Sequence, residues 1–221
     1  MDGAKFVTPA RLRTPRVAAI AGIAFSVILG AALVLVRISV PSDPSDAGEW
    51  LTDRGKRAAV AFALNLVPFA GIAFLWFIGV VRDRIGEHED RFFATVFLGS
   101  GVLFIGMLFV GAAVAAGVLA DPNIEAGRIV SSGSWGLGQR VTQTVLNVYA
   151  IRMGAVFILS TTTIGVRTRI VPRWLAAGGY VAALVLLVGT GLSLWVNILL
   201  PVWVLVLSGY ILIVNVRMER T

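Results

Sequence analysis

The sequence predicts an all-helical integral membrane protein: a bundle of six transmembrane helices with both ends of the chain in the cytoplasm. Three observations lead to this fold class. Of the 221 residues, 57% are hydrophobic and only 14% are charged, whereas a soluble domain carries about a quarter charged residues. The apolar residues gather in stretches long enough to cross a bilayer. The arginines and lysines lie mostly between these stretches and are distributed unevenly between the two sides of the membrane.

The number of spans follows from the lengths of the apolar runs. Lipid cannot satisfy backbone amides, so a spanning segment must be a helix of roughly 20 apolar residues. The run 174–216 is more than twice that length, and we therefore expect it to turn near Ser193–Asn197, with a re-entrant hairpin as the alternative. Pro201 suits the first turn of the next helix, where its missing N–H costs nothing. The predicted spans are 17–36, 58–81, 93–119, 141–166, 174–194 and 198–216.

The orientation follows from the positive charges in the connecting segments, because cytoplasmic loops are enriched in arginine and lysine. If the N-terminus is inside, the cytoplasmic segments hold 12 of these residues, the outer segments hold 6, and Arg152 lies within a span. The tails 1–16 and 217–221 are therefore predicted to be cytoplasmic. The first apolar run is longer than the core of a usual cleavable signal, so we expect it to be a retained helix.

The outer loops carry few signals of their own. Asp46 and Glu49 resemble a capping box, which predicts a short helix that leads into the second span. The second outer loop, 121–140, is rich in glycine and serine but lacks the Gly-Lys-Ser/Thr ending of a phosphate-binding loop. Four tryptophans fall near predicted membrane interfaces, where indoles usually anchor helices; they are Trp50, Trp135, Trp174 and Trp195.

The residues that are missing argue against an enzyme. The chain has no cysteine and one histidine, His88, so disulfides, thiolate metal sites and two-histidine sites cannot form within one chain. All twelve acidic residues lie outside the predicted spans. Carboxylate-dependent transport or intramembrane proteolysis would need acidic residues inside the spans. Residues 87–90 could bind a metal by composition, but we interpret them as a solvated turn. We predict no catalytic residue, no metal and no cofactor; the loop acids in 43–53 and 121–125 are the only candidates for catalysis.

Arg152 is the one ionisable residue well inside a predicted span. It lies about nine residues from the outer end of the fourth span, which is roughly 14 Å deep, and an arginine there costs about 2.5–3.5 kcal/mol on insertion scales. One hypothesis is that it binds an anion, such as a lipid phosphate or a substrate carboxylate. The alternative is that it snorkels outward or donates to carbonyls and polar side chains of the bundle.

Four further polar residues lie at similar depth and could line an outward-opening pocket around this arginine: Asn65, Asn147, Tyr149 and Asn197. Pro68 removes a helical hydrogen bond one turn after Asn65, as kinked membrane helices often do near a cavity. The alternative is that each asparagine only bonds across helices. We expect the hydroxyls of residues 160–163 to donate hydrogen bonds to backbone carbonyls of the preceding turn. We expect the small residues of the third span to let another helix approach closely.

The stretches 66–84 (LVPFAGIAFLWFIGVVRDR) and 89–95 (EDRFFAT) resemble uncharacterised multipass membrane proteins of actinobacteria. The resemblance covers roughly the second and third spans. It implies a bacterial inner membrane and no particular activity.

The sequence leaves several functional classes open. The leading hypothesis is a non-catalytic scaffold, or a protein that binds lipid or a partner, with an outward site for an anionic headgroup at Arg152. The alternative is a small transporter or channel for an anionic or neutral solute, and an enzyme ranks last. Expected partners are membrane lipids and either another protein or a second copy of the chain. Nucleic acid is not expected, because the basic residues form no stripe with interleaved aromatics.

Overall fold

A computed structural model of the chain describes residues 14–40, 49–85, 91–121, 133–169, 171–189 and 194–218, and their regular structure is entirely helical. The elements are α1 (Thr14–Ser39), α2 (Glu49–Thr52), α3 (Arg54–Ile85), α4 (Arg91–Leu119), α5 (Gly133–Thr144), the π-helix η3 (Val145–Ala150), α6 (Ile151–Arg167), α7 (Arg173–Val188), the 3₁₀ helix η4 (Leu194–Ile198) and α8 (Leu199–Met218).

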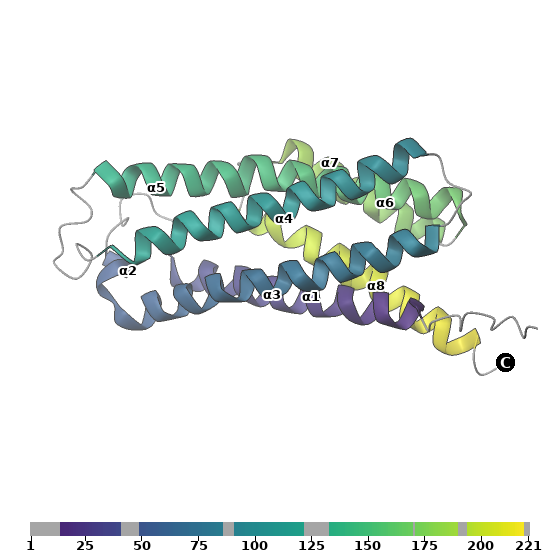
Figure 1. Ribbon diagram of the computed structural model, residues 1–221, viewed down its shortest axis with the longest axis horizontal. Coiled ribbons are helices and arrows are strands. Elements are labelled where there is room, and N and C mark those ends of the chain that lie inside the picture. Colours follow the sequence, from purple (N-terminus) through teal and green to yellow (C-terminus); the bar gives the residue numbers. More distant parts are fainter. Residues whose placement is uncertain are drawn as a thin grey trace, which may run out of the picture.

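The helices form one elongated bundle, and the first and last described residues lie at the same end of it (Figure 1). Five helical stretches are long and apolar enough to cross a membrane: α1, α3, α4, the continuous α5–η3–α6 rod, and η4 with α8. The sixth apolar helix, α7, has 16 residues, about 24 Å at 1.5 Å per residue, which is shorter than the roughly 30 Å hydrocarbon core of a bilayer. The predicted all-helical class with several long apolar helices is confirmed.

Two predicted boundaries differ from the observed ones. The helix of the fourth predicted span begins at Gly133 rather than at residue 141, so residues 133–140 of the predicted second outer loop 121–140 are helical. It is helical because α5 packs along α4, and such packing stabilises a helix whose glycines lower its intrinsic propensity. The fifth helix ends at Val188, six residues before its predicted end. Residues 190–193 lie outside the described residues, and the part of the predicted turn from Leu194 to Asn197 belongs to the 3₁₀ helix η4.

Other local expectations agree with the structure. Pro201 lies in the first turn of α8. A short helix, α2, begins at Glu49, although Asp46 lies outside the described residues. The cap of α3 is instead Asp53, whose Oδ1 accepts hydrogen bonds from the backbone N–H groups of Gly55 at 2.8 Å and Lys56 at 3.2 Å. These bonds satisfy donors that the first turn of a helix leaves without intrahelical partners.

A cluster of phenylalanines forms the centre of the core. Phe74 of α3 lies 4.4 Å from Phe25 of α1, 4.8 Å from Phe157 of α6 and 5.5 Å from Phe104 of α4, measured between ring centroids. Four helices therefore meet at one aromatic contact. The outer faces of the same helices carry many exposed large apolar side chains, among them Phe69 and Trp76 of α3, as expected where lipid rather than water surrounds a bundle.

The small residues and three of the four hydroxyls in residues 160–163 behave as predicted, whereas the Thr162 hydroxyl is buried without a hydrogen-bond partner among the described residues. Ser160, Thr161 and Thr163 donate hydrogen bonds to carbonyls one turn back, at 2.6–2.9 Å. Gly101 of α4 faces Ile78 of α3 and Phe157 of α6, and a methyl group at Gly101 would collide with both. Close helix approach at this glycine is therefore internal to the bundle.

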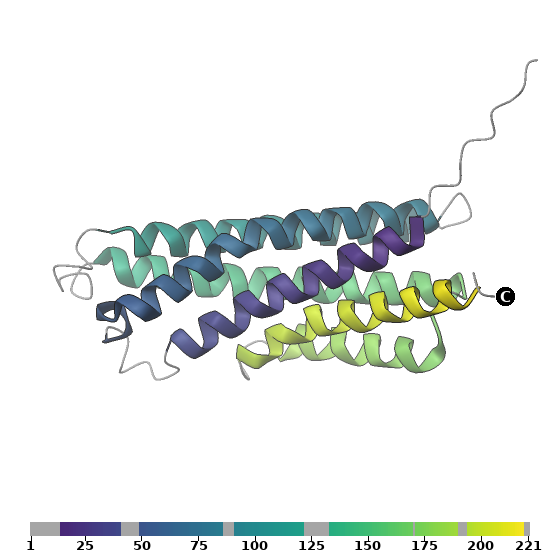
Figure 2. The same ribbon diagram turned by 90° about the horizontal axis from the view of Figure 1, so that it is seen from below.

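The helices do not all extend to the same end of the bundle. Figure 2 shows that α1 and α8 stop short of the end reached by α3, α4 and α5. We call this the α2 end, because α2 lies there. Helix α5 packs mainly on α4 and η3, whereas α1 packs on α3 and α8. The space between α1 and α5 is therefore not closed by direct helix packing.

Candidate ligand-binding cavity

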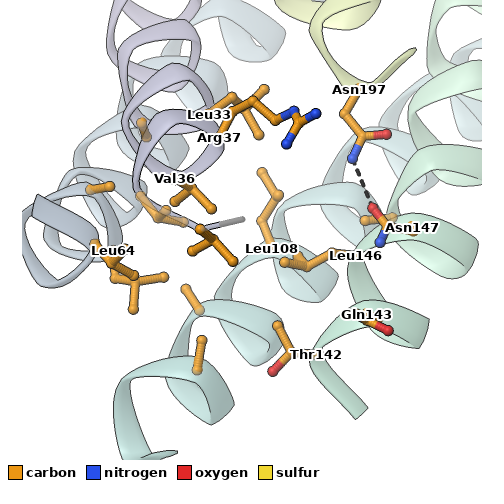
Figure 3. A pocket seen from close by; sticks show the side chains of 18 of the residues that line it. Leu33, Val36, Arg37, Leu64, Leu108, Thr142, Gln143, Leu146, Asn147 and Asn197 are labelled. Atoms are coloured by element: carbon orange, nitrogen blue, oxygen red, sulfur yellow. Dashed lines mark hydrogen bonds between the residues drawn. The ribbon is translucent and has the colours of Figure 1, made fainter. Parts of the chain in front are cut away.

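A cavity of about 300 Å³ lies towards the α2 end, between α1, α3 and α4 on one side and α5, η3 and η4 on the other. Its volume is at the lower limit of typical small-molecule sites, which span about 300–1,000 Å³. Its walls differ in chemistry. The side formed by α1, α3 and α4 is apolar, with residues such as Leu33, Leu64 and Leu108, which Figure 3 shows around the cavity.

Most of the polar side chains that line the cavity lie on the opposite side, and Arg37 of α1 is the exception. Most belong to α5 and η3, one comes from η4, and one arginine comes from the last turns of α1; they are Gln139, Thr142, Gln143, Asn147, Asn197 and Arg37. On α5 and η3 these residues recur at intervals of three and four, which is the spacing of one helix face. A single face of the rod thus presents amide and hydroxyl groups to a cavity whose far wall is hydrocarbon.

Asn147 and Asn197 connect the two irregular segments of the fold. The Nδ2 atom of Asn197 in η4 donates to the Oδ1 atom of Asn147 in η3 at 2.8 Å, as drawn in Figure 3. An amide side chain has two N–H donors and one oxygen with two lone pairs. This one hydrogen bond therefore leaves both amides with further capacity for a ligand. A π-helical turn inside an α-helix is rare and is often found at functional sites.

Arg37 places a positive charge at the same part of the cavity. Its side chain is half-buried, and its guanidinium carbon lies 5.9 Å from the centroid of the Trp195 ring in η4, within the range of a cation–π contact. Figure 3 shows the guanidinium close to Asn197 and on the same side as Asn147. Among the described residues that line the cavity, none is acidic.

Thr142 is the third polar feature. Its Oγ1 atom is buried and has no hydrogen-bond partner among the described residues. A buried hydroxyl without a partner costs free energy. Thr142 lies on the cavity wall, where a ligand or an ordered water can complete its hydrogen bonding.

Two tryptophans close the α2 end. Trp50 and Trp135 are 7% and 9% exposed, and their ring centroids are 6.2 Å apart. Burial of this pair is not what we expected of indoles that anchor helices near a membrane interface, because the two rings pack against each other over the cavity and both line it. Trp174 and Trp195 are 63% and 51% exposed.

No protein family model matches the chain, and no curated protein or solved structure matches it either. The resemblance to actinobacterial membrane proteins stays a prediction.

The structure brings together two of the five residues predicted to form a site, Asn147 and Asn197. Arg152 is exposed on the outer face of α6 and does not line the cavity. The reason is helical geometry: its neighbour Ile151 faces the cavity, and successive residues of an α-helix point about 100° apart. Tyr149 is 53% exposed and also lies outside the lining.

Asn65 is likewise outside the cavity. It is exposed, and its Nδ2 donates to the carbonyl of Ala61 one turn back at 2.8 Å. No group of three metal-ligating side chains occurs among the described residues. The acidic turn 86–90 with His88 lies outside the described residues.

The cavity includes residues that the sequence analysis did not select: Arg37, Gln139, Thr142 and Gln143. Arg37 was counted only as a loop charge, and Gln139 was placed in a loop. The sequence did contain a signal for this helix face. Trp135, Gln139, Thr142 and Leu146 follow one another at intervals of four, three and four residues, a spacing that is typical of one face of a helix.

Proposed function

We propose that the protein is a non-catalytic, six-span membrane protein of the bacterial inner membrane that binds an amphipathic molecule taken from the bilayer. The cavity is lined mainly by apolar side chains, and most of its few polar groups lie on the side of α5, η3 and η4; this arrangement carries the proposal. A molecule with an apolar chain and a polar group would bury its chain against α1, α3 and α4. Its polar group would meet Asn147 and Asn197.

The six spans and their orientation belong to the same proposal. Helix α7 crosses as the sixth span despite its length, which agrees with both described ends of the chain lying at one end of the bundle. The excess of arginine and lysine at that end favours a cytoplasmic location. The cavity then lies in the outer half of the membrane, at the depth of lipid headgroups and upper acyl chains.

The orientation can be tested with single cysteines, because the chain has none of its own. Lys56→Cys and Arg173→Cys lie at opposite ends of the bundle, and both positions are exposed. We expect a membrane-impermeant maleimide to label the Lys56→Cys variant in intact cells and the Arg173→Cys variant only after permeabilisation. The reverse pattern would overturn the orientation.

The binding proposal is tested by filling the cavity. Ala115 of α4 lines it, and its neighbour Ala116 is exposed on the other face of the helix. We expect Ala115→Phe to lose the lipid that co-purifies with the wild type in native mass spectrometry, whereas the matched variant Ala116→Phe keeps it. Equal lipid retention in all three proteins would contradict binding in this cavity.

Transport is the second candidate function. Two irregular segments, η3 and η4, face each other at the Asn147–Asn197 hydrogen bond, and interrupted helices often surround the sites of transporters. Solute flux into liposomes that depends on Asn147 would favour transport over static binding.

A further inference from the structure

We infer that the ligand of this cavity is an anionic amphiphile with a single alkyl chain, whose carboxylate or phosphate lies at Arg37. The inference rests on the proposed function and adds the charge of the ligand and the number of its chains. Neither property follows from the existence of an amphipathic cavity alone.

The charge follows from what the polar side of the cavity offers. Arg37 contributes a fixed positive charge, and Asn147, Asn197 and Gln143 line the same cavity with amide donors. Figure 3 shows the guanidinium extending from α1 towards Asn197, whose amide is bonded to Asn147. A guanidinium matches the geometry of a carboxylate or a phosphate and can bind either with two parallel hydrogen bonds.

The position of Arg37 suits a headgroup rather than a deeply buried ion. It lies two residues before the end of α1, where a long basic side chain can keep its charge near the membrane interface while its stem packs on apolar surface. The guanidinium contacts the face of Trp195, which limits the directions it can take. The anionic group of a lipid would meet it at the depth where such groups normally lie.

The number of chains follows from the size of the cavity. Below Arg37, the lining continues along α1 to Leu29, eight residues away, which is about 12 Å along a helix. An engineered 150 Å³ cavity binds benzene, so 300 Å³ accommodates about a dozen carbon atoms. This is enough for one medium-length alkyl chain and too little for two chains side by side.

The proposal is tested by titrating the purified protein in a neutral detergent with three probes that share one chain length: dodecanoate, dodecyl phosphate and dodecanol. Binding is measured by native mass spectrometry. We expect both anions to bind the wild type at least tenfold more tightly than dodecanol. Comparing dodecanoate with dodecyl phosphate then distinguishes a fatty-acid head from a phosphate head.

Variants separate the charge from the cavity. Arg37→Gln removes the charge but keeps a polar side chain. We expect it to weaken the binding of both anions about 10- to 100-fold, as expected for hydrogen bonds to a charged group. The affinity for dodecanol should change less than threefold. Arg54→Gln is the matched control, because Arg54 is exposed at the same end of the bundle and does not line the cavity. Arg152→Gln tests the site predicted from sequence alone.

Each outcome has a distinct meaning. If dodecanol binds as tightly as the anions, and Arg37→Gln changes nothing, the anionic ligand is refuted while binding in the cavity stands. If Arg152→Gln or Arg54→Gln weakens the anions as much as Arg37→Gln does, the assignment to Arg37 is wrong. If Ala115→Phe binds every probe like the wild type, the proposed function itself fails. Tight binding of a diacyl phosphatidylglycerol that displaces the single-chain anions would overturn the single-chain limit.

Discussion

Helix α4 offers a prediction in which the same substitution has opposite effects at two positions of one helix. Gly101 is buried, and a Cβ atom there would lie 2.5 Å from Cδ1 of Ile78 and 3.2 Å from the ring of Phe157. Gly106 is exposed, and a Cβ atom there would meet nothing within 4 Å. The two glycines share a helix and a membrane environment, and they differ in what surrounds them.

The magnitudes follow from this difference. Replacing glycine by alanine at an open helical position stabilises a protein by about 0.4–1 kcal/mol through the entropy of the unfolded chain. At Gly101 the new methyl group must move the buried Cδ1 of Ile78, and the fully buried ring of Phe157 must give by a few tenths of an ångström; overpacking of this kind costs typically about 1–3 kcal/mol. Gly101→Ala should therefore be less stable than Gly106→Ala by roughly 1–4 kcal/mol, and only Gly106→Ala should match or exceed the wild type.

The assay is reversible unfolding by SDS in mixed micelles, followed by circular dichroism. Gly99→Ala serves as a second control, because Gly99 is also exposed with open space around it. If Gly101→Ala proves as stable as Gly106→Ala, then α3, α4 and α6 do not meet at Gly101 as described. If all three variants are destabilised alike, the effect belongs to the helix in lipid and not to packing.

Two further predictions concern the core and the cavity. Phe74→Ala should lower the free energy of unfolding by about 3–5 kcal/mol, because the ring of Phe74 is fully buried. Phe69→Ala, on the exposed face of α3, should lower it by less than about 1 kcal/mol. The midpoints of SDS unfolding measure both effects, and equal losses would contradict the placement of the core. In a double-mutant cycle, Asn147→Ala and Asn197→Ala should be coupled by about 0.6 kcal/mol and by no more than about 1.7 kcal/mol; additive effects would mean that the hydrogen bond between their amides is not formed.

The fold class could be predicted from the sequence because lipid imposes one rule on every segment. Apolar runs of sufficient length must be helices, and within the described residues this rule located the five long apolar helices and the shorter helix α7. It located helix ends less well. The fourth span begins in a stretch that contains Gly133, Gly136 and Gly138, which read as a loop, and only packing against α4 explains its helical form.

The site was predicted less completely, because depth along a helix can be counted from sequence whereas direction around the helix depends on the neighbouring helices. Arg152 was selected for its depth, yet it shares one exposed face of α6 with Leu159 and Val166, at intervals of seven residues. That interval was visible in the sequence. Arg37 was overlooked because a charge near a helix end is ordinary, and only the position of η4 gives it Trp195 as a neighbour.

The asparagines show why part of the site was accessible to sequence reasoning. Each is the only amide in a segment of apolar residues, Val145–Ala150 and Leu194–Ile198, and a buried amide without a partner is costly. The sequence thus required a partner for each, but it could not identify one 50 positions away. Packing alone accounts for a single hydrogen bond between them. It does not account for the glutamines and threonine on the same face of α5, or for the buried Thr142 hydroxyl, and this surplus of polar groups beside a hydrocarbon wall favours a bound ligand over a purely structural contact.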